Sequence, residues 1–264
     1  MKVTFCKILK VKKRQQDILL QLNQRNIVKV AELANIYNVS GVTIRRDLEQ
    51  LQKQGLLFRT HGGAILIERR SNDYEFSYST RKIENILEKE KIARAAANLI
   101  EDEEAVIIDA GTTTGQIPKF ISEKKNLVII TNSIYTSLEL GKKIGITVIL
   151  IGGLLKYDPA TLAGIAAEEF LNKFYAKKLF LGVGGISIEH GITYFDLMEN
   201  ELRKVMLMRS EVRIVLADHT KFNKVATVSV GPINSVNKII TDNKTPENIV
   251  RKIREMGVEV IIAD

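Results

Sequence analysis

Hydrophobic residues in the first fifth of the chain recur with the period of an α-helix. Three short helices are therefore predicted, over residues 14–25, 29–38 and 40–55. The third is the clearest, because Ser40 is a suitable N-cap, Gly55 is a suitable stop, and Ile44, Leu48 and Leu51 form one apolar stripe. Three such helices, with a tight connection between the second and the third, match helix-turn-helix architecture.

Two short β-like runs follow, in the stretch LLFRTHGGAILI. They flank the polar, glycine-containing turn RTHGG, so the stretch predicts a β-hairpin, which would be the wing of a winged helix. Arg59 and His61 lie near the tip of this hairpin. Wings commonly contact phosphate or the minor groove, and glycine permits close approach of the backbone.

Beyond residue 80 the pattern changes to apolar runs that alternate with amphipathic stretches. Seven runs predict strands, at residues 105–110, 126–132, 146–153, 177–185, 212–218, 238–242 and 258–263. Continuous apolar strands separated by helices indicate a mostly parallel sheet that is covered on both faces. We therefore expect an N-terminal basic extension, a winged helix-turn-helix domain, a linker and a larger α/β domain, over residues 1–12, 13–68, 69–79 and 80–264.

Charge separates the two domains. Residues 1–70 contain 14 Lys and Arg against 5 Asp and Glu, whereas the remaining residues contain 25 against 26. The net charge of +8 therefore resides in the first quarter of the chain, which favours a polyanion as partner of the smaller domain. A solvated basic surface without a partner is the alternative.

The third helix carries its polar residues on the side opposite the apolar stripe. At 100° per residue, Val42, Thr43 and Arg46 lie away from Ile44, and Arg45 flanks them. In helix-turn-helix proteins this end of the helix enters the major groove, where arginine reads guanine and threonine contacts bases or phosphate. The predicted DNA-binding residues are Ser40, Val42, Thr43, Arg45, Arg46, Arg59 and His61.

Polar or glycine-rich residues follow five of the predicted strands of the larger domain. In an open parallel sheet, ligands bind at the carboxyl ends of the strands, so a shared pocket is expected there. Candidate residues are Asp109, Gly111, Thr112, Thr113, Thr114, Asn132, Gly152, Gly153, Gly184, Asp218 and Lys221. Each cluster alone is also consistent with ordinary turn chemistry.

The loop DAGTTTGQ, residues 109–116, has the composition of a phosphate-binding turn. Backbone N–H groups at a glycine turn bind phosphate, and threonine hydroxyls add donors. No GK[ST] sequence is present, so a triphosphate with Mg²⁺ is not indicated, and a phosphate monoester is the simpler ligand. For a sugar phosphate, Lys221 would supply a cation, while Asn132, Asp196 and Glu199 would face hydroxyl groups. No metal and no other cofactor is predicted.

Taken together, SGVTIRRDL and GLLFRTHGGA resemble the helix-turn-helix signature of DeoR-family transcriptional regulators. The resemblance covers nearly the whole chain from about residue 13. It implies a C-terminal sugar-phosphate-sensing domain, similar in fold to ribose-5-phosphate isomerase, glucosamine-6-phosphate deaminase and coenzyme A transferases. The stretch DLMENELRKVM resembles the family segment N-x-x-E-A-x-x-K-R-x-M, which adds Arg203 to the candidate site, although Asp196 replaces the usual asparagine and Arg203-Lys204 reverses the usual order. A solvated helix face is the alternative for Arg203 and Lys204.

The resemblance implies a repressor that binds double-stranded operator DNA, responds to a phosphorylated sugar and forms a homodimer or homotetramer. The alternative is a sugar-phosphate isomerase or deaminase with a DNA-binding appendage, because Asp109, Glu199 and Asp218 are possible bases. A single cysteine and the lack of a long apolar run favour the cytoplasm over a membrane or a disulfide-rich secreted class.

Overall fold

The computed structural model describes residues 13–25, 27–53, 56–60, 62–65, 78–122, 124–156 and 160–264. These residues form two compact units, Met1–Glu84 and Asn85–Asp264. The division falls a few residues beyond the predicted start at residue 80, because Tyr78 is buried and Ile83 packs against the core of the smaller unit. The predicted extension over residues 1–12 and most of the predicted linker lie outside the described residues.

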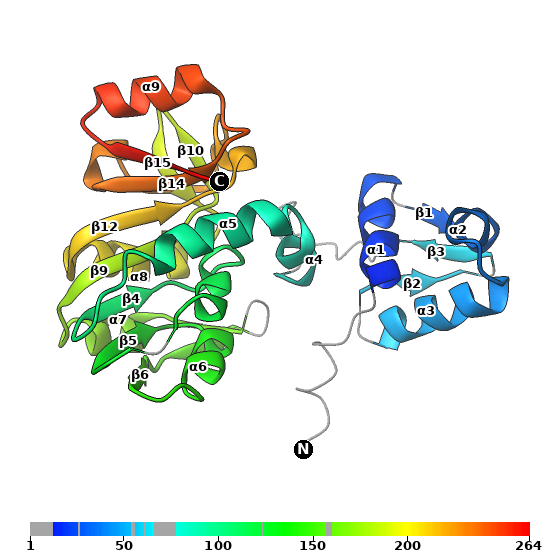
Figure 1. Ribbon diagram of the computed structural model, residues 1–264, viewed down its shortest axis with the longest axis horizontal. Coiled ribbons are helices and arrows are strands. Elements are labelled where there is room, and N and C mark those ends of the chain that lie inside the picture. Colours follow the sequence, from blue (N-terminus) through cyan, green and yellow to red (C-terminus); the bar gives the residue numbers. More distant parts are fainter. Residues whose placement is uncertain are drawn as a thin grey trace. The chain divides into compact units, whose positions relative to one another are not determined.

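The smaller unit is a winged helix-turn-helix domain (Figure 1). Its elements are α1 (Lys13–Arg25), β1 (Ile27–Lys29), α2 (Val30–Tyr37), α3 (Gly41–Lys53), β2 (Phe58–Arg59), β3 (Gly63–Ile65) and α4 (Tyr78–Ile83). The predicted wing is the antiparallel pair of β2 and β3, and β1, which we did not predict, pairs with β3 on its other side. The apolar stripe of α3 is fully buried, as its spacing predicts.

The turn between α2 and α3 is fixed by two caps. Asn38 adopts a left-handed conformation with φ of 50°, and the N–H of Val39 donates to the carbonyl of Ala34, which closes α2. The side chain of Ser40 accepts a hydrogen bond from the N–H of Thr43 at 3.2 Å, which confirms Ser40 as the N-cap of α3.

The larger unit is built on a parallel seven-stranded sheet with the order β15-β14-β12-β9-β4-β5-β6. Its strands are β4 (Ala105–Ile108), β5 (Leu127–Thr131), β6 (Ile146–Leu150), β9 (Ala176–Gly182), β12 (Ser210–Leu216), β14 (Lys238–Asp242) and β15 (Glu259–Ala263). All seven predicted strands are confirmed. The five strands whose polar ends we singled out, β12, β9, β4, β5 and β6, are consecutive neighbours, so their carboxyl ends share one edge of the sheet.

Helices cover both faces of this sheet, as predicted. They are α5 (Ile86–Ala97), α6 (Ile134–Leu140), α7 (Ile165–Leu171), α8 (Leu197–Met208) and α9 (Glu247–Glu255), with short 3-10 helices η2 (Thr114–Lys119), η3 (His219–Lys221) and η4 (Ile233–Ser235). Alternate residues of β4 show the two layers, because Val106 and Ile108 pack in one cluster with Ile92 of α5, whereas Ile107 packs in the other with Leu202 of α8.

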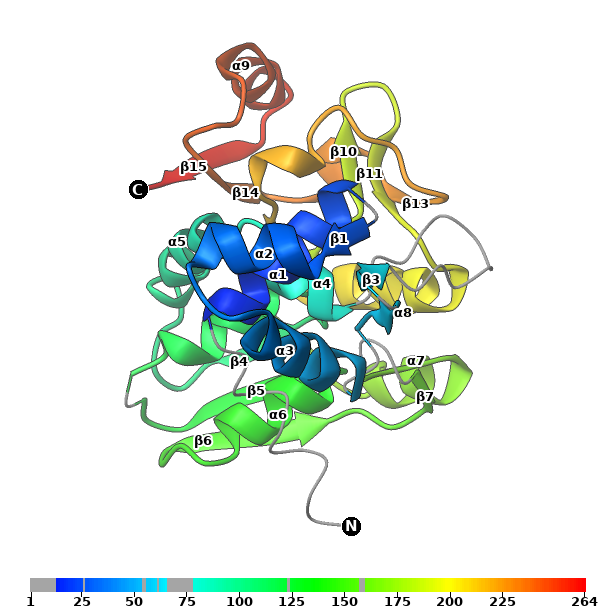
Figure 2. The same ribbon diagram turned by 90° about the vertical axis from the view of Figure 1, so that its right-hand side faces the viewer.

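Two smaller sheets were not predicted. The strands β7 (Leu154–Lys156) and β8 (Thr161–Ala163) form an antiparallel pair, and β10 (Gly185–Ser187), β11 (Gly191–Tyr194) and β13 (Val228–Gly231) form an antiparallel sheet. Figure 2 shows the latter three strands grouped together. All are three or four residues long, too short for alternation to show in the sequence.

Candidate functional site

The outer face of α3 carries two exposed arginines at the end where the sequence places DNA contacts. Arg45 and Arg46 are exposed, and neither forms an ion pair with a described residue. Val42 beside them is 56% exposed, which is high for a branched hydrophobic side chain. This face is therefore available to a polyanionic partner.

Asp47, by contrast, belongs to the interior of the domain. It is buried, and its carboxylate accepts hydrogen bonds from Arg14 at 2.6 Å and from Gln15 at 2.9 Å. This acid therefore joins α3 to α1 and does not neutralise the arginines on the outer face.

The wing is attached to α3 through its backbone. The N–H of Arg59 donates to the side chain of Gln52 at 2.8 Å, so the strand that carries Arg59 is held against the helix. His61, the other predicted wing contact, lies outside the described residues.

At the end of β4, Asp109 is fully buried, and donors surround one of its two carboxylate oxygens, Oδ2. It accepts hydrogen bonds from the N–H of Gly182 at 3.1 Å and from Nε of Arg203 at 3.2 Å. The guanidinium of Arg203 also donates to the carbonyl of Ala110, and its Cζ lies 3.4 Å from the ring centre of Tyr194. Arg203 is 0% exposed, so the alternative of a solvated helix face is wrong for this residue.

From Arg203 a chain of charges runs outward. Glu199 accepts from Arg203 at 3.3 Å, and the amino group of Lys156 lies 3.4 Å from the other oxygen of Glu199. Lys156 also pairs with Asp196, the residue whose side chain caps α8 by accepting from the N–H of Glu199. Lys156 and Asp196 are partly exposed, so the chain leads from the buried Asp109 to solvent.

The two acidic ends of this chain titrate differently. Burial raises the pKa of Asp109 to about 6, because the nearby Arg203 only partly offsets the loss of water. Burial acts on Asp196 in the same direction, but the hydrogen bond from Lys156 and the N–H groups of the first turn of α8 outweigh it and lower the pKa of Asp196. Asp109 is thus a readily protonated acid, whereas Asp196 is held as a carboxylate.

The loop after Asp109 presents donors without protein partners. Among the described residues, none accepts a hydrogen bond from the N–H of Gly111, Thr112 or Thr113. The hydroxyl of Thr114 and Oδ1 of Asp109 are buried and likewise lack a hydrogen-bond partner within the described chain. Because buried polar groups are normally satisfied, this edge has unused capacity to bind a polar ligand. The loop leads into the 3-10 helix η2, which contains Pro118.

Several other predicted residues have internal roles in this structure. Asn132 uses both ends of its amide, accepting from the N–H of Ala110 at 2.8 Å and donating to Thr161 at 2.9 Å. At Gly153, which has φ of +120°, a Cβ would lie 2.6 Å from the carbonyl oxygen of Ala163. These residues shape the strand ends, and a contact of Asn132 with a ligand hydroxyl stays a prediction.

The remaining glycines differ in their surroundings. At Gly184 a Cβ would lie 3.0 Å from the ring of Phe195, so a side chain there would need its neighbours to shift by a few tenths of an ångström. Gly152 is exposed, and a Cβ there would meet no described atom within 4 Å. Neither observation calls for a ligand.

Asp218, at the end of β12, forms a second polar cluster. One of its oxygens pairs with Lys89 of α5 at 3.3 Å, with both side chains buried, and the other accepts from the N–H of Thr220 at 3.0 Å. Lys221 is half-buried in the 3-10 helix that follows. One strand, β9, separates this cluster from Asp109 at the end of β4.

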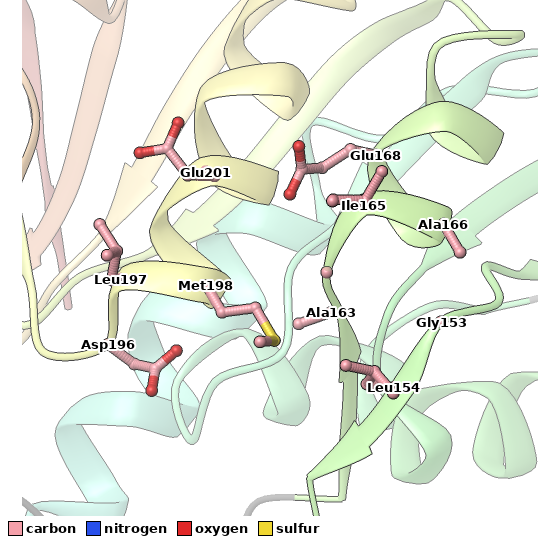
Figure 3. A pocket seen from close by; sticks show the side chains of 11 residues that line it. Gly153, Leu154, Ala163, Ile165, Ala166, Glu168, Asp196, Leu197, Met198 and Glu201 are labelled. Carbon is pink, nitrogen blue, oxygen red and sulfur yellow. The ribbon is translucent and has the colours of Figure 1, made fainter.

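An open hollow of about 870 Å³ lies beside the outer end of the charge chain (Figure 3). It is lined by Gly153, Leu154, Ala163, Gly164, Ile165, Ala166, Glu168, Asp196, Leu197, Met198 and Glu201. Its charged lining residues are all carboxylates, and two of them are paired with lysines, Asp196 with Lys156 and Glu201 with Lys204. Buried polar atoms without a hydrogen-bond partner among the described residues lie instead at the loop after β4, in Asp109 and Thr114.

Two basic residues that complete these clusters escaped the sequence analysis. Lys156 lies in a short strand without a recognisable pattern, and Lys89 falls in the charged run LEKEK, which is typical of a solvated helix face. Only the three-dimensional arrangement brings them to Glu199 and Asp218.

Two kinds of feature are absent from the described residues. None of their helices is long and apolar enough to cross a membrane. No group of three or more His, Cys, Asp or Glu side chains among them is arranged to hold a metal ion.

Comparison with known families assigns both units. A model of the DeoR-like helix-turn-helix domain matches residues 14–70, and a model of the DeoR C terminal sensor domain matches residues 84–243. The second match begins within a residue of the division between the two compact units.

Relatives of similar length span nearly the entire chain. The HTH-type transcriptional regulator GolR of Listeria innocua is 35% identical over 251 residues, which cover 95% of this chain and 98% of the relative. The HTH-type transcriptional repressor CsqR of Escherichia coli is 30% identical and covers 94% of each chain. The glycerol-3-phosphate regulon repressor of Escherichia coli is 30% identical, with 96% of this chain and 99% of the relative covered.

Similarity to solved structures is weaker. The translation initiation factor eIF-2B of Pyrococcus horikoshii has a TM-score of 0.41 at 15% identity, with 88% of this chain and 83% of that chain covered. Ribose 5-phosphate isomerase of Plasmodium falciparum has a TM-score of 0.37 at 18% identity, with 51% and 52% covered. At these scores the similarity does not bear on function.

Proposed function

The chain belongs to the DeoR family of transcriptional regulators, and on this premise we propose that it is a repressor of a sugar-metabolism operon whose larger domain binds a phosphorylated sugar. As a member of this family it is a DNA-binding regulator and not an enzyme. We propose that the protein has two conformational states, one that binds the operator and one that binds the sugar phosphate. We further propose that it acts in the cytoplasm.

The DNA contacts that we propose start from the outer face of α3. Arg46 and Arg45 are exposed and form no ion pair with any described residue; they lie next to Val42 and Thr43, at the helix end that enters a major groove in this motif. Arg59, on the wing, would contact phosphate. A homodimer or homotetramer would place two such helices ~34 Å apart, or a multiple of that distance, on an operator with two half-sites.

One observation supports phosphate binding above the others. Within the described part of the chain, the consecutive N–H groups of Gly111–Thr113 have no hydrogen-bond partner, and neither has the hydroxyl of Thr114 that follows them. Such a run of donors suits the oxygens of a phosphate monoester. Several relatives of the chain are repressors, and one is named for the glycerol-3-phosphate regulon.

The linked charged side chains that run from Asp109 to Asp196 would then bind the sugar part of the ligand. Arg203 is occupied by Asp109 and Glu199, so we assign it to positioning these carboxylates and not to the phosphate. Lys156 and Asp196, at the exposed end of the chain, would exchange their mutual contact for hydroxyl groups of the ligand. Lys221 remains our candidate for a counter-charge, from the end of β12.

Replacing Thr114 with valine, which removes the hydroxyl and keeps the shape of the side chain, tests this assignment. Hydrogen bonds to a charged group contribute about 1.5–3 kcal/mol, so we expect affinity for the effector to fall about tenfold or more in Thr114→Val, with DNA binding retained. Calorimetric titration with phosphate monoesters of fructose, tagatose, glycerol and glucosamine measures the first, and DNA anisotropy the second. Thr147→Ala, on the exposed edge strand β6, is the control. Equal effector affinity in both variants would contradict a phosphate site at this loop.

A further inference from the structure

The first turn of α5 is attached to three different strand-end loops through three consecutive residues. Glu88 pairs with Lys244, just after β14; Lys89 pairs with Asp218, just after β12. Glu90 pairs with Lys119 at 2.8 Å, in the 3-10 helix that continues the Gly111–Thr114 loop. A displacement of any of these loops therefore acts on the same helical turn.

These three ion pairs are not equivalent. Glu88–Lys244 and Glu90–Lys119 each involve a largely exposed lysine, and such pairs contribute little. Lys89 and Asp218 have side chains only 3% and 1% exposed, so their charges interact in a low-dielectric interior. Breaking a buried pair leaves an uncompensated charge, which is strongly destabilising. Of the three ion pairs, the one between Lys89 and Asp218 therefore contributes most to holding the first turn of α5.

The same turn of α5 lies at the junction of the two units. The smaller unit ends at Glu84, after α4, and the larger one begins at Asn85. Asn85 has φ of 48°, a left-handed conformation, and it immediately precedes α5. Four residues thus separate the junction from Lys89, about one helical turn.

An anion bound at the loop after β4 would act on this pair through its charge, across the end of the one intervening strand, β9. Its negative charge attracts the ammonium of Lys89 and repels the carboxylate of Asp218, so it weakens the attraction between them. A shift of the Gly111–Thr114 loop on anion binding would act on the same turn through the ion pair of Lys119 with Glu90. Both effects favour a different position of α5 when the site is occupied.

We infer that Lys89 is a positioning residue that couples occupancy of the strand-end site to the DNA-binding unit, by changing how the first turn of α5 is held. This inference rests on the proposed function, since it concerns how the proposed effector is sensed. Lys89 contacts neither DNA nor effector in this mechanism. It is therefore expected to be dispensable for each binding event alone and required for their coupling.

The test uses full-length Lys89→Met, with Lys91→Met as the matched control on the exposed side of the same helix. Operator DNA is obtained by selecting duplexes from a random pool with the wild-type protein. DNA affinity is then measured with and without the phosphate monoesters of fructose, tagatose, glycerol and glucosamine, and effector affinity is measured separately. Lys89→Gln is measured alongside, because it keeps a hydrogen-bond donor for Asp218 without the charge.

In the wild type and in Lys91→Met we expect the effector to change DNA affinity about 5- to 150-fold. Both Lys89 variants should bind the effector and the DNA but lose this change. A full response in the Lys89 variants would overturn the inference, and so would loss of effector binding, which would make Lys89 part of the site. If no probe alters DNA binding by the wild type, the proposed function itself fails.

A second measurement needs no effector. Amide exchange over residues 86–93 should be faster in Lys89→Met than in the wild type, and unchanged in Lys91→Met, because only Lys89 holds the turn to Asp218. Equal exchange in the two variants would overturn the inference whatever the effector does.

Discussion

Replacing Asp109 with asparagine should remove a specific part of the dependence of stability on pH. The carboxyl group of Asp109 is fully buried, and burial raises its pKa from 3.8 to about 6, despite the nearby Arg203. In the unfolded chain the group ionises near its ordinary value. Between about pH 4 and about pH 6 the unfolded state has therefore lost a proton that the folded state keeps, and stability falls as the pH rises.

The size of the effect follows from the shift. About two pKa units correspond to about 3 kcal/mol, complete below the ordinary pKa and lost as the pH rises through about 6. About 2 kcal/mol of this should be lost between about pH 4.5 and about pH 6.5. Asparagine is nearly isosteric and cannot ionise, so this loss should be absent from Asp109→Asn.

The assay is urea unfolding at the two pH values, followed by amide exchange of β4 and β9. These strands report the larger unit alone, which matters because a chain with two compact units need not unfold in one step. Asp196→Asn is the control, because the pKa of Asp196 is lowered and its contribution disappears only at more acidic pH. An equal loss of stability in the wild type and Asp109→Asn would show that Asp109 is already ionised at the lower pH, which refutes the reasoning.

Three further predictions concern the smaller unit. Arg46→Ala should relax base preference at one operator position in selections from random duplexes, with a loss of about 1–3 kcal/mol in discrimination between bases there. An unchanged preference would place Arg46 outside the groove. Arg59→Ala should weaken binding to all sequences alike and reduce the salt slope by about 1, and a sequence-dependent loss would contradict a phosphate contact. Asp47→Asn should lower the free energy of unfolding of this unit by about 1–3 kcal/mol, since it weakens the contact with Arg14; thermal melts identical to the wild type would contradict that role.

The sequence sufficed to predict the elements whose residues form long regular patterns. The stripe Ile44, Leu48, Leu51 and the cap at Ser40 define α3, and continuous apolar runs define the seven strands of the parallel sheet. These patterns are local, because the residues that bury and cap each element lie within or next to that element in the sequence. The polar strand ends could be expected to share an edge, because parallel strands all end on the same side.

What the sequence could not supply is which charges meet. Apart from the family resemblance, Arg203 and Lys204 are equivalent helix-face cations in the sequence, yet Arg203 is buried against Asp109 and Lys204 pairs with Glu201 near the surface. Asn132 follows a strand and has a polar side chain, as a ligand contact would, but its amide is hydrogen-bonded to Ala110 and Thr161. Such outcomes depend on the order of strands and on helix rotation, which no local pattern encodes.

The central claim is that a phosphorylated sugar alters operator binding by this protein. Its most direct test is the anisotropy of a labelled, selected operator titrated with the wild-type protein, with and without each phosphate monoester, with sugar-phosphate recovery quantified afterwards. We predict that one monoester changes DNA affinity by about 5- to 150-fold and is recovered unchanged. If every monoester leaves DNA affinity unaltered, or if the effective one is consumed, a sugar-phosphate-sensing repressor is contradicted.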